Sequence, residues 1–324
     1  MADSAMEAVP LLTLSGKVSI LFLGHGYGFL VIGLIFNGIG MGLITNSVHM
    51  FIAGTDDDEE KQKGFSLFNA GSLSGINCGM MLGASLAGMV GQRTVFIFSA
   101  TAWLLVAVLF LLMGKHMSAV QQAKTQKKKT GAFLVSRGVV PYMLLIQIPY
   151  VIINSFVFYY VPIYGAEMGF SENIVCLFLM LNSLCSVYLS VPLTDYMIDR
   201  FKEKSIYLAS VISFAALLLF GWKSTVSMLV LVLLILGIAG SFGNAVRQVF
   251  FTELKGVEEY GEDSAMGIYN FMDNIGESAG PMMFGSLMSG PNVFAGLAGF
   301  VAVSGVMNGA YALFFGKVKK NERN

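Results

Sequence analysis

Long apolar segments without charged side chains recur along the chain, and their lengths predict its structural elements. Residues 64–92, 94–114, 138–166, 205–222 and 224–246 contain no Asp, Glu, Lys or Arg. Each segment approaches or exceeds the roughly 18–20 residues that a helix needs to cross a bilayer core of about 30 Å. Apolar and polar residues do not alternate as they would in barrel strands. The pattern therefore predicts membrane-spanning helices, which satisfy their own backbone hydrogen bonds in lipid.

The boundaries of these segments predict nine spans and one weaker candidate. The nine cover residues 29–54, 64–91, 93–114, 139–164, 173–196, 205–222, 225–254, 264–289 and 293–316, and the weaker one covers about 5–24. The weaker segment lacks the basic region and the cleavage site of a signal peptide. Composition agrees, since 55% of the 324 residues are hydrophobic and only 12% are charged, against roughly a quarter charged in soluble domains. We expect an all-α, multi-pass membrane protein with about ten transmembrane helices.

Charged residues are balanced in number but uneven in position. Lys and Arg total 20, as do Asp and Glu, so net charge suggests no nucleic-acid partner. If alternate loops are cytoplasmic, nearly all basic residues fall on one side, and the other side receives only Arg93 and Lys223. This bias predicts a cytoplasmic carboxyl terminus. We expect the membrane to be a bacterial plasma membrane, and we make no prediction of oligomeric state.

The longest polar segment, residues 115–137 with "KTQKKKTG", separates two groups of spans. It predicts a basic cytoplasmic linker between an incomplete amino-terminal bundle, residues 1–114, and a carboxyl-terminal six-helix bundle, residues 138–324. The linker is either a solvated connector or a segment that binds anionic lipid headgroups.

Residues suited to metal binding or catalysis are too scattered to form a site. The cysteines, Cys78, Cys176 and Cys185, lie inside spans without metal-ligand spacing, and His25, His49 and His116 are far apart in the sequence. "GHGYG" and "GIGMG" lack the preceding strand that a nucleotide-binding loop requires. We therefore predict no metal, no cofactor and no enzymatic activity.

The sequence contains an internal repeat. At an offset of 201 residues (267 − 66), residues 66–86 align without gaps on 267–287, and six pairs are identical: Asn69–Asn270, Gly75–Gly276, Gly79–Gly280, Met81–Met282, Ser85–Ser286 and Leu86–Leu287. Both regions hold corresponding positions in the order of spans, which indicates a parallel repeat of two halves. The spans at 139–164 and 173–196 have no counterpart in the first half, so two amino-terminal helices are expected to be missing.

Two motifs extend this pattern to a known family. "DYMIDRFKEKSIYL" (195–208) resembles a loop of the form Gly-x-x-x-Asp-Arg-x-Gly-Arg/Lys, with Asp199 and Arg200 at the Asp-Arg pair and Lys204 at the trailing base, although Asp195 and Lys202 replace the glycines. "GESAGPMMFG" (276–285) resembles a Gly-Pro pattern that the same family has on its fifth helix. In this chain the pattern lies in the span at 264–289, which corresponds to the family's eleventh helix. With the two-bundle layout, these motifs resemble the major facilitator superfamily, covered here from its third to its twelfth helix.

The resemblance implies a secondary active transporter that moves a small solute by alternating access, with a coupled proton as one option. A second interpretation is a transporter-like membrane domain that acts as a sensor or anchor without transport. A third is a truncated, inactive fragment. The first two helices would supply part of the cavity in the family, so their absence favours the second interpretation.

Glycines recur every four residues in the span at 64–91, which corresponds to the family's fifth helix: Gly71, Gly75, Gly79 and Gly83. In the second half, Gly276 and Gly280 have the same spacing. Such strips let helices approach closely and gain van der Waals contact in lipid. The interpretation is helix packing, with a surface on which the two bundles rock as the alternative.

Two carboxylates lie deep in an otherwise apolar span. Asp273 and Glu277 are four residues apart, hence on one helix face, and a helix that enters the membrane near residue 264 carries them about 14 Å and about 20 Å deep. Charged groups at that depth face a bundle interior or a wet cavity. We expect both to bind substrate or a cation, or to carry a proton; a purely structural polar pairing is the alternative. Asn154 and Asn182 are weaker candidates for the same cavity.

Arg247 is the other charge within a span. By resemblance to the family, a salt bridge from Arg247 to Asp199, beside Arg200, would act as a cytoplasmic latch that favours the outward-facing state. The alternatives are direct anion binding by Arg247 and an inert pairing with Glu253.

Overall fold

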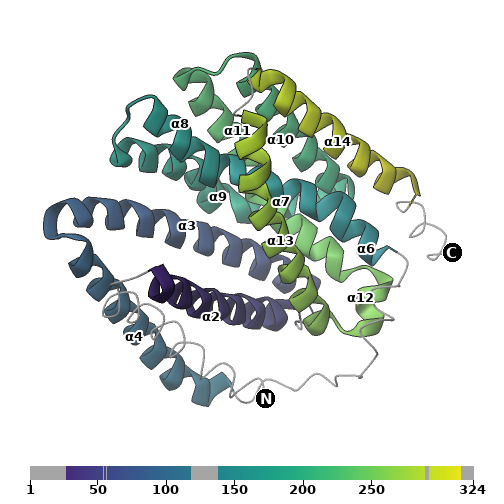
Figure 1. Cartoon of the computed structure of the whole chain (residues 1–324). Helices are drawn as coiled ribbons and strands as arrows, with labels where there is room; N and C mark the ends of the chain where they lie inside the picture. The colour runs from purple at the N-terminus through teal and green to yellow at the C-terminus, as the bar shows by residue number, and fades with distance from the viewer. Residues whose placement is uncertain (1–26, 54, 56, 118–137, 289–291, 315–324) are drawn as a thin grey trace. The chain divides into compact units, whose positions relative to one another are not determined.

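The computed structural model describes residues 27–53, 55, 57–117, 138–288 and 292–314, and regular structure among them is helical throughout (Figure 1). The first helices are α2 (Tyr27–Ala53), α3 (Asp58–Val90) and α4 (Gln92–Met117). Next come α6 (Val139–Tyr142), η1 (Met143–Gln147), α7 (Ile148–Ser155), η2 (Phe156–Tyr160) and α8 (Val161–Glu167). The remainder are α9 (Glu172–Phe201), α10 (Lys204–Trp222), α11 (Val226–Thr252), α12 (Lys255–Tyr260), α13 (Glu262–Met288) and α14 (Val293–Phe314).

The helices confirm the all-α membrane fold. Each of the nine predicted spans coincides with a helix or, for 139–164, with the continuous run from α6 to α8. Five described segments are long and apolar enough to cross a membrane: Val139–Glu167, Glu172–Phe201, Lys204–Trp222, Val226–Thr252 and Val293–Phe314. Helix α13 is long enough to cross a membrane, at 27 residues, but its four carboxylate side chains lower its mean hydropathy. The weaker span at 5–24, most of the linker and the carboxyl terminus lie outside the described residues.

The described helices form two compact units. Unit 1 contains α2, the end of α3 from Leu82, and α4; unit 2 contains the start of α3 up to Met81 and the helices from α6 to α14. The expected bundles, 1–114 and 138–324, stay a prediction. The site described below lies entirely within unit 2.

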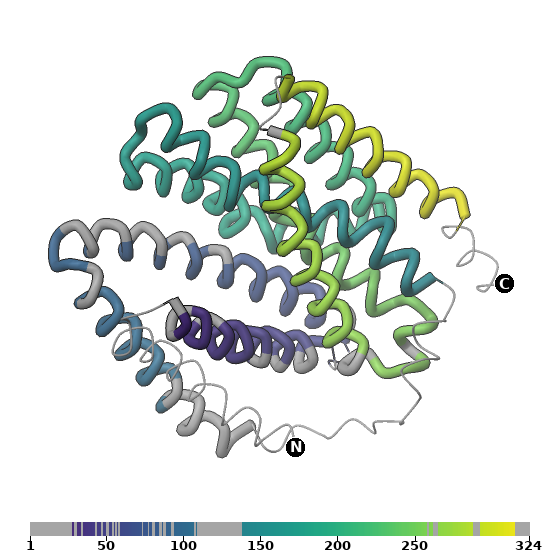
Figure 2. The backbone as a smooth tube through the Cα atoms, viewed as in Figure 1, coloured from purple at the N-terminus to yellow at the C-terminus, as the bar shows by residue number. Residues whose placement is uncertain are grey.

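The segment from Val139 to Glu167 is one continuous path interrupted by two π-helical turns (Figure 2). Each turn ends two residues before a proline: η1 precedes Pro149, and η2 precedes Pro162. Proline cannot donate a backbone hydrogen bond, and its ring crowds the carbonyl four residues earlier. Widening the preceding turn relieves that crowding. The two prolines therefore fix how this helix directs its side chains.

An aromatic core holds unit 2 together around Phe156 in η2. The Phe156 ring is fully buried and lies 5.2 Å from the Phe220 ring of α10 and 5.8 Å from the Phe284 ring of α13. Tyr160 stacks on it at 5.4 Å. This core fixes α10 and α13 against the π-helical turn, and so sets the position of the preceding turn, which carries polar side chains.

The two glycine strips have different surroundings. Gly276 and Gly280 pack against α7: a Cβ on Gly276 would lie 3.1 Å from Val151 Cγ1, and one on Gly280 would lie 2.5 Å from Ser155 Cβ. No heavy atom of another described element lies within 4 Å of the corresponding point on Gly71, Gly75, Gly79 or Gly83. Close helix contact therefore exists at the second strip, whereas the role of the first strip stays a prediction.

Candidate functional site

Asp273 is linked to the π-helical turn through Gln147. The Gln147 side chain is almost completely buried, at 1% exposed, and its Nε2 donates to Asp273 Oδ1. Asp273 itself is half-buried and lies eleven residues after Glu262, about 16 Å along α13 at 1.5 Å per residue. Because Gln147 is the last residue of η1, the widened turn before Pro149 positions the amide that holds this carboxylate.

Arg247 is a buried cation on the neighbouring helix α11. Its side chain is 2% exposed, its Cζ lies 3.2 Å from the centroid of the Tyr150 ring, and its Nη2 donates to Asn244 Oδ1 at 2.6 Å. The cation–π contact and the amide are the partners that hold the guanidinium. The charges of Arg247 and Asp273 are close enough to act on each other, but no ion pair joins them among the described residues.

Aromatic side chains cluster around Arg247. Tyr142 donates to the Arg247 backbone carbonyl at 2.8 Å, and its ring contacts Phe251 at 5.9 Å and Tyr311 at 5.6 Å between centroids. Tyr269 contacts Phe251 at 4.8 Å, and the Tyr269 hydroxyl lies near both Arg247 and Gln147. These aromatic side chains bury the residues around Arg247, and a site of low polarity strengthens electrostatic interactions.

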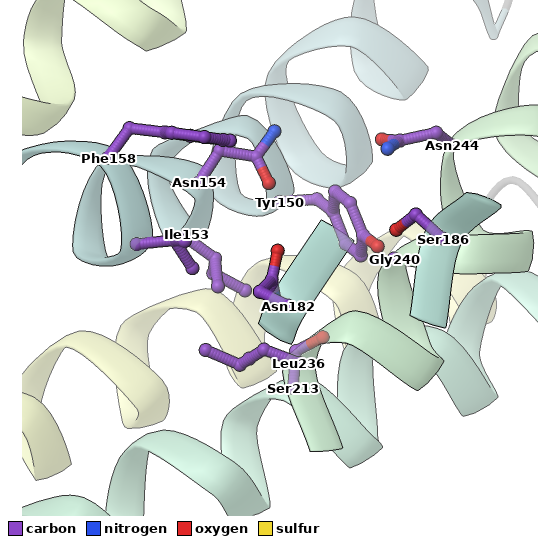
Figure 3. A pocket seen from close by; sticks show the side chains of 11 residues that line it. Tyr150, Ile153, Asn154, Phe158, Asn182, Ser186, Ser213, Leu236, Gly240 and Asn244 are labelled. Carbon is purple, nitrogen blue, oxygen red and sulfur yellow. The ribbon is translucent and has the colours of Figure 1, made fainter. Parts of the chain in front are cut away.

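A cavity lies between the helices of unit 2, and Tyr150 is one of the residues that line it. Figure 3 shows polar side chains that converge on it from three helices: Tyr150 and Asn154 from α7, Asn182 and Ser186 from α9, and Asn244 from α11. Ser213 and several apolar residues complete the lining. The cavity volume that the centre of a water-sized sphere can occupy is about 30 Å³. This is enough space for about two water molecules.

The two predicted asparagines both line this cavity, but their amides differ in availability. Asn182 Nδ2 donates to the Leu233 carbonyl at 3.0 Å, so that amide joins α9 to α11. The half-buried Asn154 side chain has no hydrogen-bond partner among the described residues. Asn154 is therefore the amide with free hydrogen-bonding capacity.

Glu277 lies one turn after Asp273 on α13 and is more exposed than Asp273. Its side chain lies on the exposed surface of α13 and has no hydrogen-bond or ion-pair partner in the described part of the chain. An exposed carboxylate in a membrane-crossing helix requires water or a partner. The structure therefore brings Asp273 together with Arg247 and Gln147, and Glu277 is close enough for its charge to act on Asp273 as well.

The predicted latch residues are not in contact in this conformation. Asp199 and Arg200 are exposed at the end of α9, and no described ion pair connects either to the buried Arg247. Other residues connect the elements near this end of unit 2: Gln62 of α3 donates to Asp195 at 2.6 Å, Asn69 donates to Gln248 at 2.9 Å, and Ser190 donates to the Ser66 carbonyl at 3.1 Å. We call these three hydrogen bonds the α3 contacts.

Sequence reasoning missed several residues of the site. Gln147, Tyr150 and Asn244 belong to the site, and none of them is among the site residues predicted from the sequence. Pro149, two residues after Gln147, is the available signal, because a proline within a span distorts the turn before it. Among the described residues, no group of three His, Cys, Asp or Glu is arranged to hold a metal ion.

Comparison with known proteins shows which family shares this arrangement. The family model described as Major Facilitator Superfamily matches residues 8–194 and 177–324. "Probable anion transporter 6" from Oryza sativa subsp. japonica is 31% identical over 140 residues, which are 40% of this chain and 33% of that protein. The matched segment thus spans about a third of the length of that relative.

Solved structures share the fold at low identity. The E. coli fucose:proton symporter FucP, in a variant form, gives a TM-score of 0.69 at 15% identity, over 95% of this chain and 83% of its own. The human organic anion transporter MFSD10 (TETRAN) gives 0.68 at 15% identity, over 95% and 76%. The proton:xylose symporter XylE, bound to 6-bromo-6-deoxy-D-glucose, gives 0.70 at 16% identity, over 97% and 80%.

Proposed function

The chain belongs to the major facilitator superfamily, and from that premise we propose that it is a secondary active transporter that moves a small solute across the membrane by alternating access. The observation that carries the proposal is a polar-lined cavity inside a bundle of apolar helices, next to a buried Arg247 and the carboxylate of Asp273. Ionisable groups inside a membrane bundle are costly and mark solute or proton paths.

Asp273 is the proposed coupling group. Its carboxylate is the one within α13 that is attached to the site, because Gln147 donates to it from the π-helical turn. A carboxylate in this position can exchange a proton or bind a cation as the cavity changes access. Glu277, one turn further along α13, is proposed to act in the same pathway on the exposed face of the helix.

The α3 contacts support the alternating-access part of the proposal. They are three separate hydrogen bonds, each with a side chain as the donor, and none is an ion pair. Net contributions are about 0.5–1.5 kcal/mol for each of the two neutral bonds and about 1.5–3 kcal/mol for the bond to the Asp195 carboxylate, so breaking all three is compatible with a conformational equilibrium of a few kcal/mol. The Asp199–Arg247 latch remains a proposal for a different conformation of the cycle.

The names of similar proteins suggest which solutes to test first. One curated relative is called a probable anion transporter, MFSD10 is called an organic anion transporter, and two solved neighbours are called proton symporters for sugars. Inorganic phosphate, acetate and D-xylose therefore form a first set of probes, each with and without an inward pH gradient.

The test is uptake of these radiolabelled probes into proteoliposomes. We expect at least one probe to accumulate above its level in protein-free vesicles, and we expect Asp273→Asn to abolish that accumulation without loss of protein from the membrane. Glu172→Gln, at the exposed start of α9, is the matched control and should transport normally. Absence of uptake for every probe contradicts the transport proposal and favours a sensor or anchor, and unaltered uptake by Asp273→Asn contradicts the role of that residue.

A further inference from the structure

Four tyrosines from neighbouring helices lie at one end of unit 2, and we call them the tyrosine group. They are Tyr207 of α10, Tyr311 of α14, Tyr142 of α6 and Tyr269 of α13. Helix α10 packs against α14, α14 packs against η1 where it continues α6, and η1 packs against α13. Figure 1 shows the start of α6, the helix α12 that precedes α13, and the end of α14 on the same side of this unit. The four tyrosines therefore belong to consecutive neighbours at one end of the bundle.

The tyrosine group extends from the helix ends into the interior. Tyr207 follows the start of α10 by three residues and Tyr311 precedes the end of α14 by three, about 5 Å along each helix. Tyr269 lies seven residues after the start of α13, about 10 Å, and Asp273 lies one turn deeper. Exposure falls in the same direction, from the half-buried Tyr207 to Tyr311 at 8% and Tyr269 at 1%. The group thus leads from the surface toward the proposed coupling group.

A carboxylate near the surface lies at the outer end of the group. Glu203, half-buried between α9 and α10, carries a charge that acts on the hydroxyls of Tyr207 and Tyr311. The Tyr311 ring contacts the Tyr142 ring at 5.6 Å between centroids, and the hydroxyls of these two residues interact electrostatically. One turn deeper on α14, the Asn308 Oδ1 atom is buried without a hydrogen-bond partner in the described chain, so it offers an acceptor to a bridging water.

At the inner end, the group reaches the cluster around Asp273. The Tyr269 hydroxyl interacts electrostatically with Tyr142 and with the charge of Asp273. Arg247 from α11 acts on the same hydroxyl, and Gln147 from η1 lies beside it. The Gln147 Oε1 atom and the Arg247 Nε and Nη1 atoms are buried without a hydrogen-bond partner among the described residues, so this cluster can also hold water.

The charge of Arg247 favours one way of moving a proton. A cation repels an excess proton, but it stabilises the negative charge that a hydroxyl acquires when its own proton leaves. The other charge that acts on Asp273 is that of Glu277, one turn along α13. A proton that passes from Tyr269 to Asp273 therefore leaves its negative charge beside the guanidinium, until the next hydroxyl replaces the proton.

We propose that the tyrosine group is a proton path between the Glu203 side of unit 2 and the Asp273 carboxylate. Asp273 takes the hydroxyl proton of Tyr269, so that one O–H bond breaks as another forms. The remaining tyrosines replace this proton in turn, through water where two hydroxyls are not in contact, and Glu203 collects the last proton from the water outside. One proton reaches Asp273, and every tyrosine regains its own hydroxyl. This inference rests on the proposed function, since it names the route to its coupling group.

The Tyr142 hydroxyl interrupts the path in this conformation. It donates to the Arg247 backbone carbonyl at 2.8 Å, so its proton is not directed to Tyr269. Rotation of this one hydroxyl breaks that bond and completes the path. A path that is broken in one conformation lets the proposed transporter load Asp273 without a constant leak of protons.

The test is the rate at which Asp273 gains a proton in the full chain in nanodiscs, without any solute. Release of a caged proton by a light pulse lowers the pH, and time-resolved infrared spectroscopy follows the C=O stretching band of protonated carboxyl groups. The part of the band that Asp273→Asn removes belongs to Asp273. Tyr311→Phe removes a hydroxyl and keeps the ring that contacts Tyr142. We expect this variant to reach the same band amplitude at a rate lower by about tenfold or more, because a positioned proton-transfer group is lost and the acid is unchanged.

Two controls separate the path from general effects of substitution. Tyr164→Phe removes a buried hydroxyl that donates to the Ser224 carbonyl at 3.0 Å, at the other end of unit 2, and should leave the rate unchanged. Glu203→Gln should slow the rise of the band as Tyr311→Phe does. Glu172→Gln, which changes an exposed carboxylate at the start of α9, should not.

An unchanged rate in Tyr311→Phe would show that Asp273 receives its proton by another face, and would overturn the path. A lower band amplitude, or equal slowing by Tyr164→Phe, would assign the effect to structure and overturn the path as well. Absence of any band that depends on Asp273 overturns the path and the coupling role together. The transport proposal fails separately: slowing in the path variants without uptake of any probe retains this inference and contradicts transport. Asp273-dependent uptake with an unchanged rate in Tyr311→Phe does the reverse.

Discussion

The repeat supplies a matched pair of substitutions that tests the packing beneath the site. Gly280→Ala places a methyl group 2.5 Å from Ser155 Cβ and still closer to its Oγ, whereas comfortable carbon contacts begin near 3.5 Å. Helices α13 and α7 must therefore separate by about 1 Å, and overpacking of this kind typically costs about 1–3 kcal/mol. The gain in helix propensity offsets at most about 1 kcal/mol, which leaves a net destabilisation of up to about 2 kcal/mol.

Gly79 occupies the equivalent position in the first half, 201 residues earlier, and an added Cβ there has no described neighbour within 4 Å. Gly79→Ala should therefore be neutral or stabilising by up to about 1 kcal/mol. The assay is reversible unfolding in mixed micelles, with the free energy of unfolding compared among the wild type and both variants. Equal stability of Gly280→Ala and the wild type, or an equal loss in both variants, would refute the packing argument.

Three further predictions concern the site and the α3 contacts. Gln147→Leu keeps the buried volume but removes the donor to Asp273; a hydrogen bond to a charged group contributes about 1.5–3 kcal/mol, so uptake should fall at least tenfold, and normal uptake would contradict the proposed linkage. Tyr150→Ala should lower uptake because the Arg247 guanidinium loses its ring contact, whereas Tyr150→Phe should retain uptake; equal uptake by both variants would contradict a role for the ring. A double-mutant cycle of Gln62→Ala and Asp195→Ala should give a coupling energy of about 1.5–3 kcal/mol in unfolding, because the acceptor is a carboxylate, and additive effects would show that this α3 contact contributes nothing.

The sequence predicted the helices well because lipid constrains them strongly. A span must be apolar over a fixed length and must be helical, so the predicted spans located α10, α11 and α14 to within about two residues at each end and α9 to within about five. The π-helical turns were not predicted, since they depend on how Pro149 and Pro162 relieve backbone crowding. The short helix α12 lies in a polar loop and carries no span signal.

The site was predicted in part for a related reason. Asp273 and Arg247 stood out because a charge within a span is expensive, and the structure places both in one region of unit 2. Their partners depend on tertiary contact: Gln147 reaches Asp273 from 126 residues away, and no spacing rule connects them. The α3 contacts involve Asp195, which replaces a glycine of the family motif, so resemblance directed attention to Asp199 instead.

The central claim, that this chain couples solute movement to Asp273, is tested most directly by comparing accumulation with exchange. Proteoliposomes with an imposed pH gradient would be supplied with the radiolabelled probe that the wild type takes up. The account predicts that the wild type accumulates this probe above its external concentration, whereas Asp273→Asn exchanges labelled for unlabelled probe without accumulating it. Full accumulation by Asp273→Asn, or a wild type that binds the probe and never moves it, would contradict the account.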